Sequence, residues 1–595
     1  MGVVFGVVGA TQPLWFLGPL IRLERRLEMP RGLLLAISIG ALLLVACSNS
    51  SDVAPRSDDV ASQSSEQSAT RAESLSPTAL PDSVSPPGRV ERPAGGRLVR
   101  LFSDPPTLDP HITTDSTSAV IVNEVFGGLV TITPDIEIAP DLAEGWDISP
   151  DGKVFTFRLR QDAKFHDGRA VVAEDFRWSI ERAADPLTES PVADLYLSDV
   201  IGVADKLNGK AQTIQGLRVI DEHTLELTID APKSYFLAKL TYPTAFVVDR
   251  KNVEGNKNNW VFEPNGTGPF RLDRYDIGET ILLGRNENYH LGPPFLDEVE
   301  FILSGGDPML MYENDEIHVT GLGLADLERV QDPANPLGTE LSTAPPGFTV
   351  SFIGMNLEQP PFDDVKFRQA LNYAVNKKEI ATTALSDLVV PAIGVIPPGF
   401  PSYNPDLRGY GYDPEKAKRL LSESRYGADP DNIPRITLSI AGNFGASVGL
   451  DMEVMLRSWQ ETLGVEVEIQ QTEWATFLQD VHQRRFQMFA LAWSADYPDP
   501  QDFLDILFHT GSANNWGNYN NREVNSLLEK ARVEPDQTAR FQQYNRIEQL
   551  IVDDAPWVPL WHSTERKVLV KPQVKDYFLL PMTIPKLRHV YITDN

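Results

Sequence analysis

The sequence predicts an α/β fold that is divided into several domains or lobes. The chain has 595 residues, which is too long for one ordinary hydrophobic core. Apolar residues make up 42% and aromatic residues 9% of the chain, which is the composition of a globular protein. From Arg97 onward, strand-like and helix-like segments alternate without an obvious repeat, and this alternation is typical of the α/β class.

The N-terminal part has the pattern of an export signal. Residues 32–46 carry no charge, and as a helix they would span about 22 Å, less than the roughly 30 Å hydrocarbon core of a membrane. They end in Leu44-Val45-Ala46-Cys47, which resembles the bacterial lipobox, whose cysteine receives a diacylglycerol. We therefore expect a signal segment over residues 1–46, with its start at Met1 or at Met29, and a lipid anchor on Cys47.

A free cysteine at the end of a transmembrane helix is the alternative interpretation. The sequence after Cys47 is rich in serine and lacks the basic flank of a stop-transfer signal, which disfavours this alternative. Residues 47–96 contain many serines, several prolines and no aromatic residue, so they cannot bury enough apolar surface to fold. We expect them to form a disordered linker between the lipid and the folded part.

Charge and cysteine content exclude several classes of protein. The chain has 53 Lys and Arg against 83 Asp and Glu, a net charge of −30, so nucleic-acid binding is not expected. Its single cysteine, Cys47, excludes an intramolecular disulfide and a cysteine-based zinc site. The nine histidines are scattered and show no zinc-binding spacing, and we predict neither a metal site nor a cofactor.

Periodicity places the individual elements. In the first half, the sequence predicts strands at 154–160 and 224–229 and a helix at 173–182. In the second half, it first predicts a helix at 364–376 and another that begins at Asp413. The later part reads as strand 436–440, a helix with an apolar stripe from Met452 to Leu463, strand 465–469, helix 474–485 and strand 486–493. Such a β-α-β-α-β run favours a mostly parallel sheet, in which ligands bind at the carboxyl ends of the strands. The segment 494–500, directly after the last strand, is therefore the first candidate for a binding site.

Many short motifs occur in an order that resembles one known family. They are Thr107-Leu108-Asp109-Pro110-His111, Val125-Phe126-Gly127-Gly128-Leu129, Pro140-Asp141-Leu142-Ala143-Glu144-Gly145-Trp146, Lys164-Phe165-His166-Asp167-Gly168, Gly266-Thr267-Gly268-Pro269-Phe270, Arg285-Asn286-Glu287-Asn288-Tyr289, Arg368-Gln369-Ala370-Leu371-Asn372, Tyr412-Asp413-Pro414-Glu415-Lys416-Ala417 and Asp496-Tyr497-Pro498-Asp499-Pro500. From about Arg97 to its end, the chain resembles the family 5 extracellular solute-binding proteins, which serve peptide and nickel ABC transporters. The resemblance implies a two-lobed periplasmic-binding-protein-like fold with a hinge and an additional small inserted domain. By position, lobe I would comprise 97–139, 236–346 and 562–595, the inserted domain 140–235, and lobe II 347–561.

The resemblance also implies which residues bind the ligand. In peptide-binding members, an aspartate just after the core strand of lobe II pairs with the ligand's α-amino group, and Asp496 matches that position. The flanking residues Trp493, Ser494, Ala495 and Tyr497 would hold the ligand backbone as an added strand. On the other lobe, Thr114, Asp115 and Ser116 match a ligand-contacting segment. An ammonium group that is enclosed by a closing cleft needs a hydrogen-bonded counter-charge, although Asp496 also suits an ordinary turn.

We therefore expect a monomeric, extracytoplasmic lipoprotein that captures di- or oligopeptides by cleft closure and delivers them to the permease subunits of an ABC importer. The same fold with a non-peptide solute, such as an oligosaccharide or a metal complex, is the first alternative. An anchored serine hydrolase is the second, because Gly445-Ala446-Ser447-Val448-Gly449 matches the G-x-S-x-G pattern. We predict that the protein is not an enzyme, because the residues between the preceding strand and this motif loosen the sharp turn that a nucleophile elbow requires. The backbone N–H groups of the same segment could instead receive a ligand carboxylate.

Overall fold

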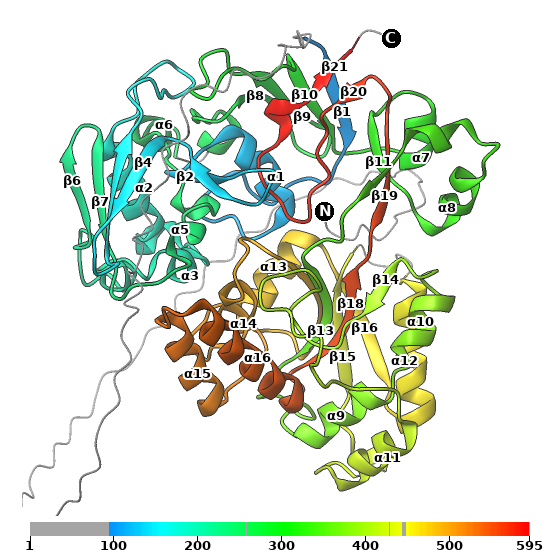
Figure 1. Ribbon diagram of the computed structural model, residues 1–595. Helices are drawn as coiled ribbons and strands as arrows, with labels where there is room; N and C mark the ends of the chain where they lie inside the picture. Colours follow the sequence, from blue (N-terminus) through cyan, green and yellow to red (C-terminus); the bar gives the residue numbers. More distant parts are fainter. Residues whose placement is uncertain (1–94, 258, 428, 443–447, 594–595) are drawn as a thin grey trace, which may run out of the picture. The chain divides into compact units, whose positions relative to one another are not determined.

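The structure, a computed structural model, describes residues 95–257, 259–427, 429–442 and 448–593. The predicted signal segment, Cys47 and all but the last two residues of the predicted linker lie outside this part of the chain. The described residues contain three larger β-sheets of seven, six and four strands (Figure 1). Two further pairs of short strands are β2 (Val130–Ile132) with β3 (Ile138–Pro140), and β20 (Val574–Lys575) with β21 (Tyr591–Ile592).

The seven-stranded sheet combines strands from distant parts of the chain. Its spatial order is β12 (Leu341–Ala344), β19 (Arg566–Val570), β11 (Val319–Gly321), β1 (Arg97–Leu101), β10 (Glu298–Ile302), β9 (Thr280–Arg285) and β8 (Phe270–Asp276). Strand β1 runs parallel to β10 and β11, and the other neighbours are antiparallel. Apolar side chains of this sheet share a buried core with α1 (Ser116–Val125) and α6 (Arg250–Gly255). A smaller core lies among β19, α7 (Pro308–Glu313) and α8 (Leu324–Gln331).

The four-stranded sheet is antiparallel and forms between β3 and α5 (Phe236–Lys239). Its order is β4 (Ala143–Ile148), β5 (Val154–Leu159), β7 (Thr224–Thr228) and β6 (Leu217–Asp221). Alternate residues of β5 and β7 are buried against α2 (Ala173–Ala183), α3 (Ala193–Leu197) and α4 (Val203–Leu207), as the period-two sequence pattern requires.

The six-stranded sheet is covered by helices on both faces. Its order is β14 (Val389–Pro391), β18 (Trp557–Ser563), β13 (Thr349–Met355), β17 (Met488–Ser494), β15 (Ile436–Ala441) and β16 (Val467–Thr472). One face packs on α9 (Val365–Tyr373), α10 (Lys377–Thr383), α11 (Pro414–Glu423) and α12 (Leu450–Leu463). The other face packs on α13 (Trp474–His482), α14 (Gln501–Phe508), α15 (Arg522–Arg532) and α16 (Gln537–Asp554). Because both faces are buried, its central strands read as nearly continuous apolar runs.

The predicted β-α-β-α-β run forms, but the sheet that contains it is mixed rather than mostly parallel. Strand β15 is parallel to β16 and to β17, as predicted. Strand β13 is antiparallel to both β17 and β18, and β14 is antiparallel to β18. The chain enters this sheet along β13, directly after β12 of the seven-stranded sheet, and leaves along β18 to β19 of the seven-stranded sheet. Strand β13 brings the chain into the six-stranded sheet and β18 takes it back, so the two run in opposite directions. Local periodicity in the sequence does not encode this direction.

Among the described residues, no helix combines the length and the apolar character that crossing a bilayer requires.

Candidate ligand-binding site

The loop that follows β17 is held in shape by a buried aspartate. Asp502, in the first turn of α14, is fully buried. Its Oδ2 atom accepts a hydrogen bond from the backbone N–H of Asp496 at 3.1 Å and another from Trp493 Nε1 at 3.3 Å. These two hydrogen bonds join the end of β17 to the start of α14 next to Asp496, the residue predicted to bind the ligand.

A second aspartate of the loop, Asp499, joins it to α16. Asp499 Oδ1 accepts a hydrogen bond from the Gln501 N–H at 2.9 Å, at the start of α14. The same carboxylate forms a two-pronged ion pair with Arg540, in which Nη1 lies 2.8 Å from Oδ2. Arg540 is 2% exposed, so this ion pair holds the loop 494–500 against α16 in an environment with little water.

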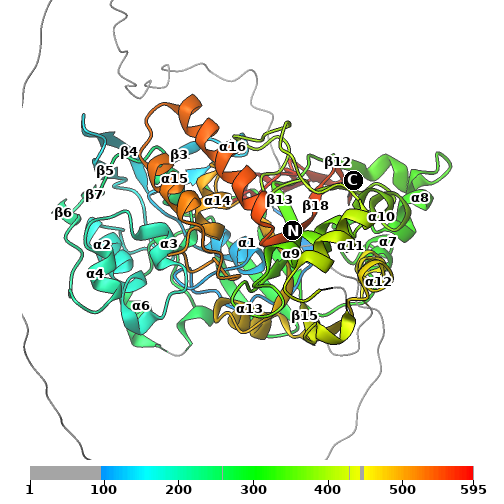
Figure 2. The same ribbon diagram turned by 90° about the horizontal axis from the view of Figure 1, so that it is seen from below.

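The Asp496 side chain lies at the contact between α14 and α3. It is partly buried, and its Oδ2 atom accepts a hydrogen bond from the hydroxyl of Tyr196 on α3. Both views of the molecule show α3 beside α14 (Figures 1 and 2). Burial raises the pKa of Asp496 to about 7, although the Tyr196 hydroxyl favours the ionised form. Within the described part of the chain, no cationic side chain forms an ion pair with Asp496.

Three tyrosines surround this carboxylate. The ring of Tyr196 stacks on that of Tyr242 with centroids 3.7 Å apart, and it meets the edge of Tyr497 at 6.3 Å. The Tyr242 hydroxyl donates a hydrogen bond to the carbonyl of Thr113 at 2.9 Å. Burial raises the pKa of each tyrosine well above its ordinary value, so all three hydroxyls are hydrogen-bond donors at neutral pH.

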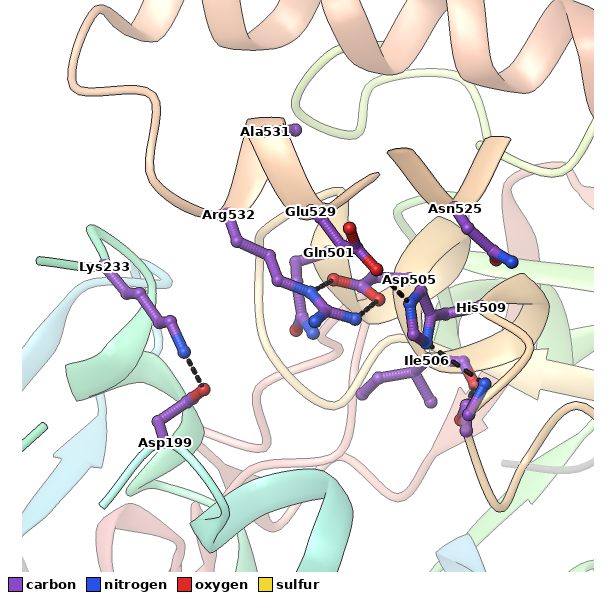
Figure 3. A network of polar contacts seen from close by, with 12 residues as sticks. Asp199, Lys233, Gln501, Asp505, Ile506, His509, Asn525, Glu529, Ala531 and Arg532 are labelled. Carbon is purple, nitrogen blue, oxygen red and sulfur yellow. Dashed lines mark hydrogen bonds and ion pairs between the residues drawn. The ribbon is translucent and has the colours of Figure 1, made fainter. Parts of the chain in front are cut away.

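The cations that lie around this region already have carboxylate partners. On the side of the four-stranded sheet, Lys233 Nζ lies 2.6 Å from Asp199 Oδ1. On the side of α14 and α15, Arg532 binds Asp505 through two N–O contacts of 2.6 and 2.7 Å (Figure 3). Neither pair involves Asp496, whose carboxylate has no cationic partner among the described residues.

One edge of β17 is open beside Asp496. The antiparallel ladder with β13 runs along the whole strand, from Met488 to Ser494. On the other side, β15 pairs only with Met488 and Phe489. Residues 490–494 therefore have no strand partner on that side among the described residues, and their backbone N–H and C=O groups can receive an extended ligand.

The predicted residues of the facing segment have a structural role in addition to any contact with a ligand. Asp115 is the N-cap of α1, and its carboxylate accepts hydrogen bonds from the backbone N–H groups of Thr117 and Ser118. Thr114 and Ser116 are partly buried. Tyr242 connects this segment to Asp496, because it binds the Thr113 carbonyl and stacks on Tyr196.

The remaining predicted residues of lobe II lie next to Asp496, with different exposure. Trp493, Ala495 and Tyr497 are buried, whereas Ser494 is partly exposed and its hydroxyl lies 2.9 Å from that of Thr349. Ser447 and most of its G-x-S-x-G motif lie outside the described residues.

Sequence reasoning missed Tyr196, Tyr242 and Asp502. Tyr196 lies in a helix of only five residues and contacts a residue 300 positions away, so no local pattern marks it. Asp502 could have been found, because a carboxylate in the first turn of the helix after the candidate loop stands close to the strand end.

Known proteins share the sequence pattern and the fold of this chain. The family model described as "Bacterial extracellular solute-binding proteins, family 5 Middle" matches residues 137–515. The periplasmic oligopeptide-binding protein OppA of Escherichia coli is 30% identical over 488 residues, which cover 80% of this chain and 88% of OppA. The probable deoxycholate-binding periplasmic protein YgiS of Escherichia coli is also 30% identical, over 80% of this chain and 89% of YgiS.

A solved structure of the Escherichia coli murein tripeptide binding protein MppA aligns with a TM-score of 0.76 and 26% identity, over 84% of this chain and 99% of MppA. The unliganded open form of the same protein gives a TM-score of 0.60, at 25% identity and over 84% of this chain and 98% of MppA. The fold is therefore the two-lobed α/β fold of periplasmic binding proteins. The chain belongs to the bacterial extracellular solute-binding proteins, family 5.

Proposed function

We propose that the protein is the substrate-binding lipoprotein of an ABC importer, which captures di- or oligopeptides between its lobes and delivers them to a membrane permease. The observation that carries this proposal is the Asp496 carboxylate, which is partly buried and has no cationic partner among the described residues. A peptide's α-ammonium group supplies the missing charge together with three N–H donors. Charge-assisted hydrogen bonds of this kind are about twice as strong as neutral ones.

The open edge of β17 supports a peptide over other cationic ligands. A peptide that pairs with Ala492, Trp493 and Ser494 would continue the six-stranded sheet and bring its N-terminus to Asp496. The buried side chains of Ala495 and Tyr497 would lie behind it, and Thr114, Asp115 and Ser116 would face it from the other lobe.

A non-peptide ligand is the alternative, and the relative named as deoxycholate-binding makes a bile acid a concrete candidate. Deoxycholate is a carboxylate anion. The ionised Asp496 carboxylate would repel such an anion in a poorly hydrated site, and the described residues offer no free cation next to it to compensate. The charge of the site therefore favours the cationic end of a peptide.

We further propose that Cys47 carries the lipid anchor, that residues 47–96 form the linker and that the protein acts as a monomer.

Lobe I would comprise 97–139, 236–346 and 562–595, the inserted domain 140–235, and lobe II 347–561. The sheets support this division, because the strands of the seven-stranded sheet all fall within the lobe I ranges and those of the four-stranded sheet within 140–235.

Ligand that is carried through purification tests the proposal. The protein is expressed with its own signal in a bacterial host, extracted with detergent, denatured and analysed by mass spectrometry. We expect a mixture of short peptides in wild-type protein and a strongly reduced amount in Asp496→Asn. A sterol, a sugar or a metal complex in place of peptides would contradict the proposal.

A further inference from the structure

Asp502 is a buried carboxylate that has no cationic partner in the described part of the chain. It is 0% exposed, its Oδ2 atom accepts the two hydrogen bonds from Asp496 N and Trp493 Nε1, and its Oδ1 atom is buried without a hydrogen-bond partner. An ionised carboxylate in such a place is costly unless a positive charge or further donors compensate it. The two hydrogen bonds from Asp496 N and Trp493 Nε1 need only an oxygen acceptor, which an amide would also supply. They therefore do not explain why a second ionisable group lies beside Asp496.

The groups around Asp502 add negative charge or none. Asp496 and Asp499 of its own loop both oppose its ionisation. Tyr196 of α3 and Tyr242 lie near the pair with neutral hydroxyls, and Tyr497 does so from the loop itself. Asp115 adds a further negative charge near Tyr242. Arg540 of α16 forms its ion pair with Asp499 and not with Asp502.

We propose that Asp502 is a second carboxylate of the cation site, which is protonated beside Asp496 in the empty protein and loses its proton to solvent when the ligand's ammonium group binds. This inference rests on the proposed function. In the exchange, the O–H bond of the Asp502 carboxyl breaks and its proton goes to water or buffer, while no covalent bond to the ligand forms. The pair of carboxylates changes its charge from −1 to −2 as one positive charge arrives, so the site keeps the same total charge.

The pKa shifts of Asp496 and Asp502 agree with a proton that is held by Asp502 and not by Asp496. Burial raises the pKa of Asp496 to about 7, and burial together with the nearby Asp496 charge raises the pKa of Asp502 well above its usual range. At pH 8 Asp496 is therefore mostly ionised, and a proton that binding releases comes from Asp502. Asp502 would act on the ligand through Asp496, so it is a positioning residue and not a direct ligand contact.

The first test needs no ligand. Infrared spectra of the empty protein at pH 8 are compared between wild type and Asp502→Asn, a variant whose amide oxygen still accepts the two hydrogen bonds. We expect the wild type to show a protonated carboxyl band that Asp502→Asn lacks. Glu548→Gln is the control, because Glu548 is 1% exposed, has a pKa raised to about 7 and binds the N–H groups of Val395 and Ile396 instead of the site. An unchanged spectrum in Asp502→Asn would overturn the proposal.

The second test counts protons during binding. Calorimetric titration with trialanine at pH 8, in two buffers of different ionisation enthalpy, gives the number of protons released by each protein. The peptide's own α-amino group contributes equally to both proteins, so the difference between them isolates Asp502. We expect the wild type to release about one proton more than Asp502→Asn, while Glu548→Gln matches the wild type. Equal proton numbers in wild type and Asp502→Asn would contradict the inference. An absence of trialanine binding to wild type would count against the proposed function instead, and the infrared comparison would still decide the protonation of Asp502.

Discussion

The hydroxyl of Tyr196 donates a hydrogen bond to the carboxylate of Asp496, across 300 residues of sequence. Tyr196 belongs to the short helix α3 and Asp496 to the loop after β17, so this bond joins the two faces between which we place the ligand. A neutral hydroxyl hydrogen-bonds the carboxylate but leaves its charge uncompensated, which is why a cationic ligand group can still be held there.

Tyr196→Phe should weaken peptide binding without disturbing the packing of the ring. The phenylalanine ring keeps the stack on Tyr242 and the edge contact with Tyr497, and only the donor to Asp496 is lost. Hydrogen bonds to charged groups contribute about 1.5–3 kcal/mol, so the Kd for trialanine should rise roughly 10- to 150-fold. Tyr242→Phe is the matched control, because its hydroxyl binds the Thr113 carbonyl instead of Asp496. Equal losses in the two variants, measured by calorimetry, would show that the Tyr196 hydroxyl has no special role.

The contact between Tyr235 and Arg540, which joins the segment before α5 to α16, should favour the ligand-holding arrangement. The guanidinium of Arg540 lies 5.2 Å from the ring centroid of Tyr235, while its N–H groups bind Asp499 of the ligand loop. Tyr235→Leu should remove a cation–π contact of about 0.5–2 kcal/mol and raise the Kd roughly 2- to 30-fold. Tyr235→Phe keeps the ring and should bind like the wild type. Similar Kd values for the leucine and phenylalanine variants would argue against this contact.

Peptide affinity should fall in acid. Burial raises the pKa of Asp496 to about 7 in the empty site, and only the ionised carboxylate pairs with an ammonium group. Below pH 7 a proton on Asp496 competes with the ligand, which alone should raise the Kd of wild type about fivefold from pH 7 to 6 and about ninefold from pH 6 to 5, and the proton that Asp502 releases should steepen this rise. Calorimetry at pH 5, 6 and 7 measures this slope, which Asp496→Asn should lack. A pH-independent Kd in wild type would count against an ionised Asp496 as the ligand's partner.

Asp502→Asn should stabilise the empty protein at alkaline pH. The folded protein holds a proton on Asp502 more tightly than the unfolded chain does, because the pKa of Asp502 is raised in the fold. This contribution to stability is fully present below the pKa of the unfolded chain and is lost as the pH rises through the folded pKa. Asparagine does not ionise, so the variant should have the higher Tm at pH 8, and the difference should shrink toward pH 5. Calorimetric unfolding at both pH values checks this, and a lower Tm of the variant at pH 8 would contradict it.

The sequence was most informative where function depends on a single strand and the loop that follows it. Strand 486–493, the candidate segment 494–500 and the parallel pairing of the β-α-β run all follow from local periodicity and chain order, and β17 and the pairing of β15 with its neighbours match these predictions. The antiparallel insertion of β13 between β17 and β18 could not be predicted, because it depends on where the chain crosses from one sheet to the other.

The side chains that surround Asp496 could not be predicted from the sequence for a similar reason. Tyr196 and Tyr242 come from segments that are brought to the loop only by tertiary packing, and neither lies in a long periodic element. Asp115 shows the opposite case. Asp115 was predicted only as a ligand contact, but its capping of α1 could have been found, because an Asp-Ser pair before an apolar run is a typical helix start.

The central claim, that Asp496 holds a peptide's α-ammonium group, is tested most directly by calorimetry with trialanine and N-acetyl-trialanine on wild type and Asp496→Asn at pH 7. Loss of one partner of a buried charge pair costs about 2–5 kcal/mol, so Asp496→Asn should bind trialanine roughly 30- to 4,000-fold more weakly than wild type. The acetylated peptide, which has no ammonium group, should bind weakly to the wild type and should not distinguish it from the variant. Equal affinity of wild type and Asp496→Asn for trialanine would contradict the account.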